Sequence, residues 1–203
     1  YGTDGAGTNV FSVSLSTAGG GTAPVGGIGS GLYALNTVDS VFSQGAEIQL
    51  FQNGRTIEGR VGAVVYFTIS TTSAGVVNLT QASGVNIWHP NTGSADESVA
   101  LTGRNGGGVD SYQIKFTQTL TDQDGDTSTA FLDLSDGRGS GSNIYTFNFN
   151  DDGPTAITPT LSALSDQVLA GLTLRVDETA GNDPDPKDTV ADRISSVDLS
   201  GLF

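Results

Sequence analysis

The sequence contains no cysteine and no methionine, and its 8 lysines and arginines stand against 22 aspartates and glutamates. The lack of cysteine excludes a disulfide framework and thiolate chemistry. The formal net charge of −14 argues against binding to nucleic acid or to anionic lipid, because such a surface repels polyanions. An acidic surface attracts cations instead, above all the hard divalent ions that prefer oxygen ligands.

Long apolar runs are missing as well. No stretch approaches the ~18 residues of a membrane span, so we expect no membrane insertion. The first residues, "YGTDGAG", have neither the basic region nor the apolar region of a cleavable signal peptide. The segment is therefore expected to be either cytosolic or part of a longer chain that another signal exports, and its composition favours the second.

Glycine is abundant, at 29 residues, and threonine, serine, valine and asparagine recur throughout the chain. This mixture suits short strands joined by glycine turns. The clearest alternation is "SYQIKFTQTL", in which Tyr112, Ile114, Phe116 and Leu120 point to one side. Similar alternation predicts further strands in "NVFSVSL", "EIQLFQ", "RTIEGR", "VVYFTIS", "GVVNLTQ", "TSTAFLDL", "IYTFNFN" and "GLTLRV". In "TSTAFLDL" we expect Ala130, Leu132 and Leu134 to face inward.

Turn residues separate these runs. Asn53-Gly54 predicts a two-residue type I′ hairpin, because both central positions of that turn need a positive φ. A second hairpin is expected across Thr72 to Gly75. The glycine-rich stretch "TAGGGTAPVGGIGSGLY" lacks the Lys-Ser/Thr of a phosphate-binding loop, so it is expected to be a long flexible loop.

Eight or nine strands in about 150 residues, without a helical stripe, predict an all-β, antiparallel β-sandwich. A closed barrel fits the uneven strand lengths less well. We expect the sandwich to occupy residues 1–154 and a Pro-containing linker to occupy residues 155–170. Residues 171–203 are expected to hold either the opening strand and loop of the next module or a strand that completes this sandwich.

Acidic residues concentrate in "TDQDGDTSTAFLDL", residues 121–134. Asp122, Asp124 and Asp126 resemble the opening of an EF-hand loop, and Asp133 occupies its twelfth position. The match fails at Thr127, where the loop needs glycine, and both flanks are strand-like rather than helical. A loop between strands can still gather these carboxylates around calcium. The alternative is a solvated turn in which aspartate caps its own backbone.

Two further acidic pairs, Asp151-Asp152 and Asp177-Glu178, end predicted strands. Neighbouring carboxylates repel one another unless a cation neutralises them. We therefore predict that calcium binds at these ends and clamps adjacent modules, the alternative being that strand ends are simply polar. The predicted metal ligands are Asp122, Asp124, Asp126, Asp151, Asp152, Asp177 and Glu178.

Catalytic patterns are not evident. The single histidine, His89, has no partner histidine or cysteine for a zinc site, and no G-x-S-x-G motif offers a nucleophile. No two acids are singled out for glycoside hydrolysis. We expect no enzyme, and we expect Trp88 and His89 to pack at a strand end before Pro90. An alternative is a sugar- or peptide-binding module with Trp88, Tyr33 and Tyr66 as aromatic platforms.

Seven blocks, in order, resemble the repeat modules of giant bacterial RTX adhesins, which are exported by type I secretion. They are "YGTDGAG", "SGLYAL", "GAEIQLFQNGRTIEGRVG", "VVYFTISTTSAGVVNLTQ", "NIWHPNTGSADESVAL", "LTDQDGDTSTAFLDL" and "FNDDGP". The resemblance covers about residues 1–154. It implies a calcium-dependent, immunoglobulin-like β-sandwich in a long extracellular fibre at the bacterial surface, and a scaffold role in adhesion and biofilm.

Modules of that family open with a strand that ends in "VDE", and the "YG-DGAG" block comes later. Here "LRVDE", residues 174–178, resembles that opening but follows the body. The resemblance implies a split module, whose partners are neighbouring modules and an inserted ligand-binding domain. It implies a monomer or a strand-swapped oligomer, and it implies as calcium ligands Asp124, Asp126, Asp151, Asp152, Asp177 and Glu178. The family's glycine-aspartate nonapeptide repeats are absent from the sequence.

Overall fold

A computed structural model describes residues 5–38, 42–92, 97–103, 112–135, 146–151, 174–177 and 194–198 of the chain. These residues form twelve strands. The strands are β1 (Ala6–Thr17), β2 (Ile28–Asn36), β3 (Ser43–Asn53), β4 (Thr56–Val61), β5 (Val64–Thr71), β6 (Val76–Gln81), β7 (Glu97–Ala100), β8 (Tyr112–Asp122), β9 (Thr127–Asp133), β10 (Phe147–Asp151), β11 (Leu174–Asp177) and β12 (Ile194–Asp198).

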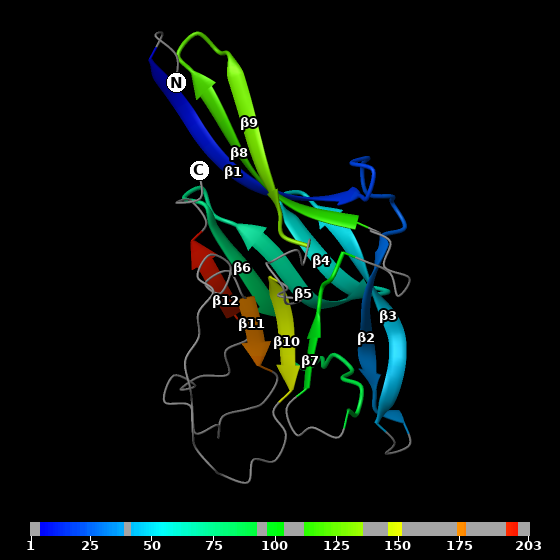
Figure 1. Cartoon of the computed structure of the whole chain (residues 1–203). Coiled ribbons are helices and arrows are strands. Elements are labelled where there is room, and N and C mark those ends of the chain that lie inside the picture. Colours follow the sequence, from blue (N-terminus) through cyan, green and yellow to red (C-terminus); the bar gives the residue numbers. More distant parts are fainter. Residues whose placement is uncertain are drawn as a thin grey trace, which may run out of the picture.

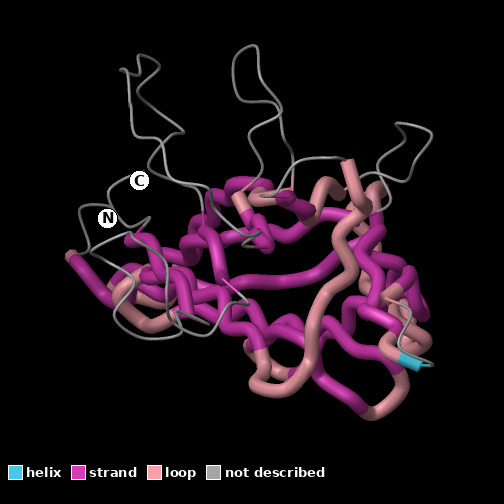
Figure 2. Tube along the Cα trace, turned by 90° about the horizontal axis from the view of Figure 1, so that it is seen from below, coloured by secondary structure: helices cyan, strands magenta, loops and turns pink. Residues whose placement is uncertain are grey.

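The strands form two facing layers (Figures 1 and 2). One layer is a six-stranded sheet in the order β12-β6-β5-β4-β3-β2. The other layer consists of two three-stranded sheets, β1-β8-β9 and β11-β10-β7. Neighbouring strands are antiparallel except for β10 and β11, which are parallel. The predicted all-β sandwich is confirmed, and the six-stranded sheet ends at β12 and β2 instead of closing into a barrel.

The core lies where the two layers meet, and the alternating residues of the sequence build it. On β1, Phe11, Val13 and Leu15 are buried, as the alternation predicts. Across the layers, the rings of Phe67 on β5 and Phe149 on β10 lie 4.9 Å apart. Gly59 makes room for one of these rings, because a Cβ at that position would lie 2.3 Å from Cε1 of Phe67. The buried aromatic rings therefore join the six-stranded sheet to the sheets that face it.

The first predicted hairpin exists, but its turn lies one residue later than predicted. Asn53 pairs with Thr56, so the two loop residues are Gly54 and Arg55, and Gly54 has a φ of 58°. The Asn53 side chain instead donates a hydrogen bond to Oε1 of Glu58 at 2.6 Å. The second hairpin, from β5 to β6, forms across residues 72–75 as predicted.

The glycine-rich stretch is a loop only in its first half. From Ile28 onward the chain forms β2, contrary to the prediction of one long loop. Leu32 and Ala34 alternate into the core and supply the burial that favours a strand. A Cβ at Gly29 would lie 2.5 Å from Oε1 of Glu47, so glycine allows the neighbouring strand's carboxylate to approach. Packing therefore overrides the low strand propensity of glycine.

The outer halves of β8 and β9, with the start of β1, extend beyond the six-stranded sheet (Figure 1). We refer to residues 6–10, 117–122 and 127–131 as the arm. Leu134 is buried and Leu132 is half-buried as predicted, but Ala130 is exposed, contrary to prediction. Val10 is 40% exposed and Phe131 is 60% exposed. Residues 6–10 and 127–131 of the arm are exposed and residues 117–122 are half-buried, because no sheet of the described residues faces the arm (Figure 1).

Two strands from the end of the sequence pack into the same sandwich. On β11, Leu174 and Val176 pair with Phe147 and Phe149 and are buried. β12 pairs with β6 and forms one edge of the six-stranded sheet. The predicted linker, residues 155–170, lies outside the described residues, as do Tyr145 of the predicted strand "IYTFNFN" and Leu172 of the predicted strand "GLTLRV". The domain boundaries at 154 and 171 therefore stay predictions.

Candidate metal site at the turn between β8 and β9

The acidic turn at the tip of the arm has a defined backbone structure. The amide of Asp122 donates to the carbonyl of Asp126 at 3.0 Å, and the amide of Gly125 donates to the carbonyl of Asp122 at 3.3 Å. The φ of Gly125 is 101°, which a residue with a side chain rarely adopts. The amide of Asp126 donates to Oδ1 of Asp122 at 2.8 Å. The turn thus presents its aspartates in a fixed backbone frame.

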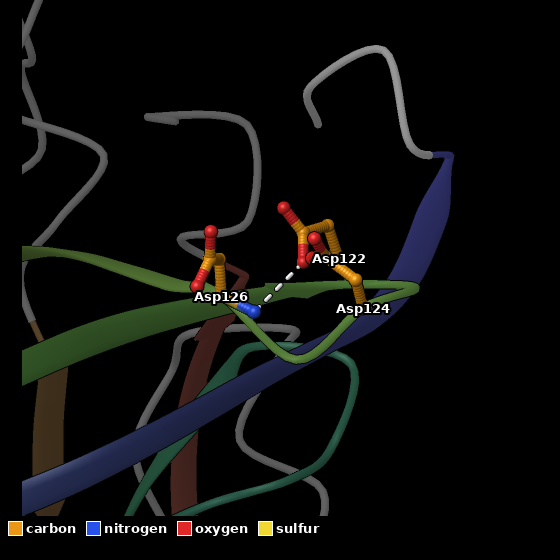
Figure 3. A group of neighbouring side chains, drawn as sticks. All are labelled: Asp122, Asp124 and Asp126. Carbon is orange, nitrogen blue, oxygen red and sulfur yellow. Dashed lines mark hydrogen bonds between the residues drawn. The ribbon is translucent and has the colours of Figure 1, made fainter.

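The structure brings Asp122, Asp124 and Asp126 together. One carboxylate oxygen from each lies within 4.8 Å of the others, and the three side chains project from the same side of the turn (Figure 3). Calcium binds oxygen at about 2.3–2.6 Å, so opposite ligands of one ion lie about 5 Å apart. The three oxygens therefore fit one calcium ion. Asp124 and Asp126 are exposed, which leaves space for water ligands.

The pKa of the Asp122 carboxyl lies below its usual range. A hydrogen bond with the Asp124 side chain lowers the pKa of Asp122, and backbone amides of the turn lower it further. Partial burial opposes this effect. Once both carboxyl groups ionise, they repel each other at short range, and a divalent cation relieves that repulsion.

The start of β1 lies directly against this turn. Ala6 pairs with Asp122 and Thr8 pairs with Thr121, so Gly7 forms a bulge between them. A Cβ at Gly7 would lie 2.4 Å from the carbonyl oxygen of Thr121 and 2.5 Å from that of Asp122. The sequence carried a signal for this contact, the glycines of "DGAG", but sequence reasoning did not connect it with the acidic turn.

Asp133 does not join the turn. It lies at the other end of β9, about 20 Å from Thr127, since six residue steps at roughly 3.3 Å each separate them. Its Oδ1 accepts hydrogen bonds from the amide of Ser135 at 2.9 Å and from the hydroxyl of Ser135 at 2.7 Å. The twelve-residue spacing in the sequence therefore does not correspond to an EF-hand loop.

Two of the remaining predicted ligands, Asp151 and Asp177, end strands β10 and β11, and these strand ends lie toward the opposite end of the sandwich (Figure 1). Asp151 ends β10, and the parallel register places Asp177 beside Asn150. Asp151 also pairs with Glu97 at the start of β7, an acidic neighbour that sequence reasoning missed. Oε1 of Glu97 already accepts a hydrogen bond from the amide of Thr92 at 3.1 Å.

The predicted roles of Asp152, Asp177 and Glu178 as calcium ligands at this second end remain predictions. The side chain of Asp177 is not described, and Asp152 and Glu178 lie outside the described residues. Of the seven predicted ligands, the structure therefore brings together the three aspartates of the arm, and it places the backbone of two others at one sheet end.

The fold and the candidate metal site together define the class of protein, which is an all-β sandwich that carries a carboxylate-lined turn at one end. The chain belongs to the family described as a domain of unknown function (DUF5801), which matches residues 1–135. Neither a curated protein nor a solved structure matches the sequence. Within the part of the chain that the structure describes, no helix is long and apolar enough to cross a membrane.

Proposed function

We propose that this chain is a calcium-stabilised structural module of a bacterial surface adhesin. It extends an extracellular fibre and holds an inserted ligand-binding domain away from the cell. The observation that carries the proposal is the group of three aspartate oxygens within 4.8 Å of one another on the turn between β8 and β9. The block-by-block resemblance to RTX adhesin repeats supplies the biological context.

Calcium bound at the tip of the arm would have a mechanical role, because it would stiffen the arm. Its strands extend beyond the six-stranded sheet, and residues 127–131 are exposed along their whole length. Few buried contacts hold such an element, so its local stability is low. An ion bound at the tip connects the end of β8 to the residues just before β9, and the bulge at Gly7 transmits that constraint to β1. Calcium would therefore stiffen the element that the core holds least.

The second acidic end supports a role in joining modules. Strands β7 and β10 bring Glu97 and Asp151 together as a register pair, and β11 brings Asp177 to the same sheet end. With a net charge of −14, successive copies of such a module repel one another in the absence of cations. Calcium held at module ends would convert that repulsion into a stiff junction.

The test is the effect of calcium on thermal unfolding. The chelated protein is melted in EDTA and in millimolar calcium, with magnesium at equal concentration as the control for ionic strength. Calcium at a hundredfold excess over its dissociation constant adds about 2.7 kcal/mol to the free energy of unfolding. For a chain of 203 residues this raises Tm by about 5–11 °C, at roughly 2–4 °C per kcal/mol.

A matched pair of variants assigns the effect to this turn. Replacing Asp122, Asp124 and Asp126 by asparagine together should remove most of the calcium-dependent rise. Asp133→Asn serves as the control, because that carboxylate is engaged with Ser135. It should lower the Tm in EDTA yet keep the calcium increment. An unchanged Tm for the native chain would refute calcium binding, and an unchanged increment in the triple variant would refute this turn as the site.

A further inference from the structure

A cleft of about 730 Å³ is lined by four segments: the end of β2, Phe42 with the start of β3, the connection that follows β6, and the end of β10. The ends of β2 and β10 and the start of β3 lie at the end of the sandwich opposite the arm (Figure 1). The volume of the cleft falls within the roughly 300–1,000 Å³ of small-molecule sites. Loops joined to a rigid sandwich are also where binding residues commonly lie.

Two aromatic side chains flank the cleft. Phe42 is 71% exposed, which is costly for a large apolar side chain in water. Trp88 is half-buried, and Tyr33 packs edge-to-face against it at 6.4 Å between ring centroids. The amide of Trp88 also donates to the carbonyl of Tyr33 at 2.7 Å. The indole is therefore held in place, while Phe42 offers an uncovered face beside it.

Neutral polar groups complete the lining. Gln44 and Asn86 are exposed and carry amides, which both donate and accept hydrogen bonds. His89 lies with Nε2 3.1 Å from the carbonyl oxygen of Phe149. Because a carbonyl oxygen only accepts, this contact places the proton on Nε2. Asp151 contributes the one carboxylate of the described lining, which contains no lysine or arginine.

We propose that this cleft is a binding subsite for a neutral saccharide. A pyranose ring has an apolar C–H face that packs on an aromatic ring, and a rim of hydroxyl groups that both donate and accept. Phe42 and Trp88 match the apolar face, and the amides of Gln44 and Asn86 match the hydroxyl rim. An acidic sugar would meet Asp151 and a strongly negative protein, so a neutral sugar is favoured.

A cationic ligand is the competing occupant, since an ammonium group would bind Asp151 and the aromatic faces. Such a ligand needs acceptors only and would leave the N–H groups of both amides unused. A saccharide uses donors and acceptors alike, so the composition of the lining favours it. The proposal goes beyond a scaffold role, because the module would then contribute to adhesion directly.

Trp88 makes the test specific, because it is the single tryptophan of the chain. Its fluorescence and its indole N–H resonance report on this cleft alone. The full chain is titrated to millimolar concentrations with glucose, galactose, mannose, fucose and N-acetylglucosamine, each in turn. Sialic acid is the anionic control ligand, and the amide of Nα-acetyl-lysine, which keeps its charged side chain, is the cationic control ligand. We expect a saturable change with at least one neutral sugar and none with sialic acid.

Substitutions then test whether the change at Trp88 arises from sugar bound in this cleft. Phe42→Ala should weaken binding by about tenfold, close to the upper end of an aromatic contact. Asn86→Ala should weaken it as well, since the Asn86 side chain is exposed and the hydrogen bond from the amide of Leu35 goes to its backbone carbonyl, which alanine retains. Phe131→Ala, an exposed aromatic residue of the arm, should leave the affinity unchanged.

Three outcomes would overturn the proposal: no saturable change with any neutral sugar, equal affinity in Phe42→Ala, or saturation by the lysine amide alone. Repeating the titration in EDTA separates this proposal from the calcium proposal. The cleft contains one predicted calcium ligand, Asp151, whereas Phe42 and Asn86 are not among those ligands and the aspartate turn of the arm lies at the other end of the sandwich (Figure 1). Sugar binding without a calcium effect on Tm would support the saccharide proposal and refute the calcium proposal. A calcium effect on Tm without sugar binding would do the opposite.

Discussion

Strand β11 should contribute as much to stability as a strand of the main body, and Val176 offers the cleanest measurement. Its side chain is 1% exposed and its register partner is Phe149. Val176→Ala removes two buried carbons, at about 0.8 kcal/mol each, so the loss from transfer alone is roughly 1.6 kcal/mol. The cavity left behind raises the total toward about 3 kcal/mol. For this chain length the corresponding fall in Tm is about 3–12 °C.

The matched control is Val25→Ala, the same chemical change at a residue that is 100% exposed. It should stay within about 0.5 kcal/mol of the native chain. A second buried position, Leu174→Ala, should cost about 2–5 kcal/mol.

The assay is urea unfolding followed by circular dichroism, at two protein concentrations and with light scattering to measure mass. If β11 packs within its own chain, the urea midpoints of the native chain and of Val176→Ala are both independent of protein concentration. If β11 is exchanged between copies, both midpoints fall on dilution and the scattering mass exceeds that of a monomer. Equal stabilities for Val176→Ala and Val25→Ala would refute the packing of β11 on β10.

Two further changes probe the arm. Gly7→Ala places a Cβ within 2.4–2.5 Å of two backbone oxygens and should lower the free energy of unfolding by about 1–3 kcal/mol, measured by thermal unfolding. Gly19→Ala is the control and should be neutral, because a Cβ at Gly19 has open space around it. Equal effects of the two substitutions would contradict the bulge at Gly7. The lowered pKa of Asp122 contributes stability that is present above the unfolded-state pKa, near 4, and is lost as pH falls through the lower folded-state pKa. In EDTA, the Tm of Asp122→Asn should therefore fall less steeply with decreasing pH below about pH 4 than the Tm of the native chain. Identical dependence of Tm on pH in this range would contradict this.

Alternation in the sequence predicted most of the core, because each buried strand has one face toward the opposite layer. It failed at Ala130, since the pattern of β9 continues past the place where the facing sheet ends. It also failed at β2, where glycines lower strand propensity but Leu32 and Ala34 still reach the core. Burial depends on what lies opposite a residue, and a single sequence does not contain that information.

The candidate metal site shows the same limit. The aspartates of the turn are close in sequence, so their proximity in space could be predicted from spacing alone. The bulge at Gly7 and the pairing of Glu97 with Asp151 join residues that are far apart in sequence, and only strand register reveals them. The cleft beside Phe42 is assembled from four separate segments, so no local pattern could have indicated it.

The long ladder between β1 and β8 determines how tension would pass through this molecule. The two strands run antiparallel from Ala6–Asp122 to Thr17–Tyr112. A pull on β1 along its own axis would load these hydrogen bonds in shear, so they share the force instead of opening one by one. The bulge at Gly7 interrupts the ladder beside its outermost pair, and that pair includes a residue of the aspartate turn. The pair Ala6–Asp122 lies outside that interruption and would separate before the continuous ladder does, so an ion held at Asp122 would raise the force at which the arm begins to open.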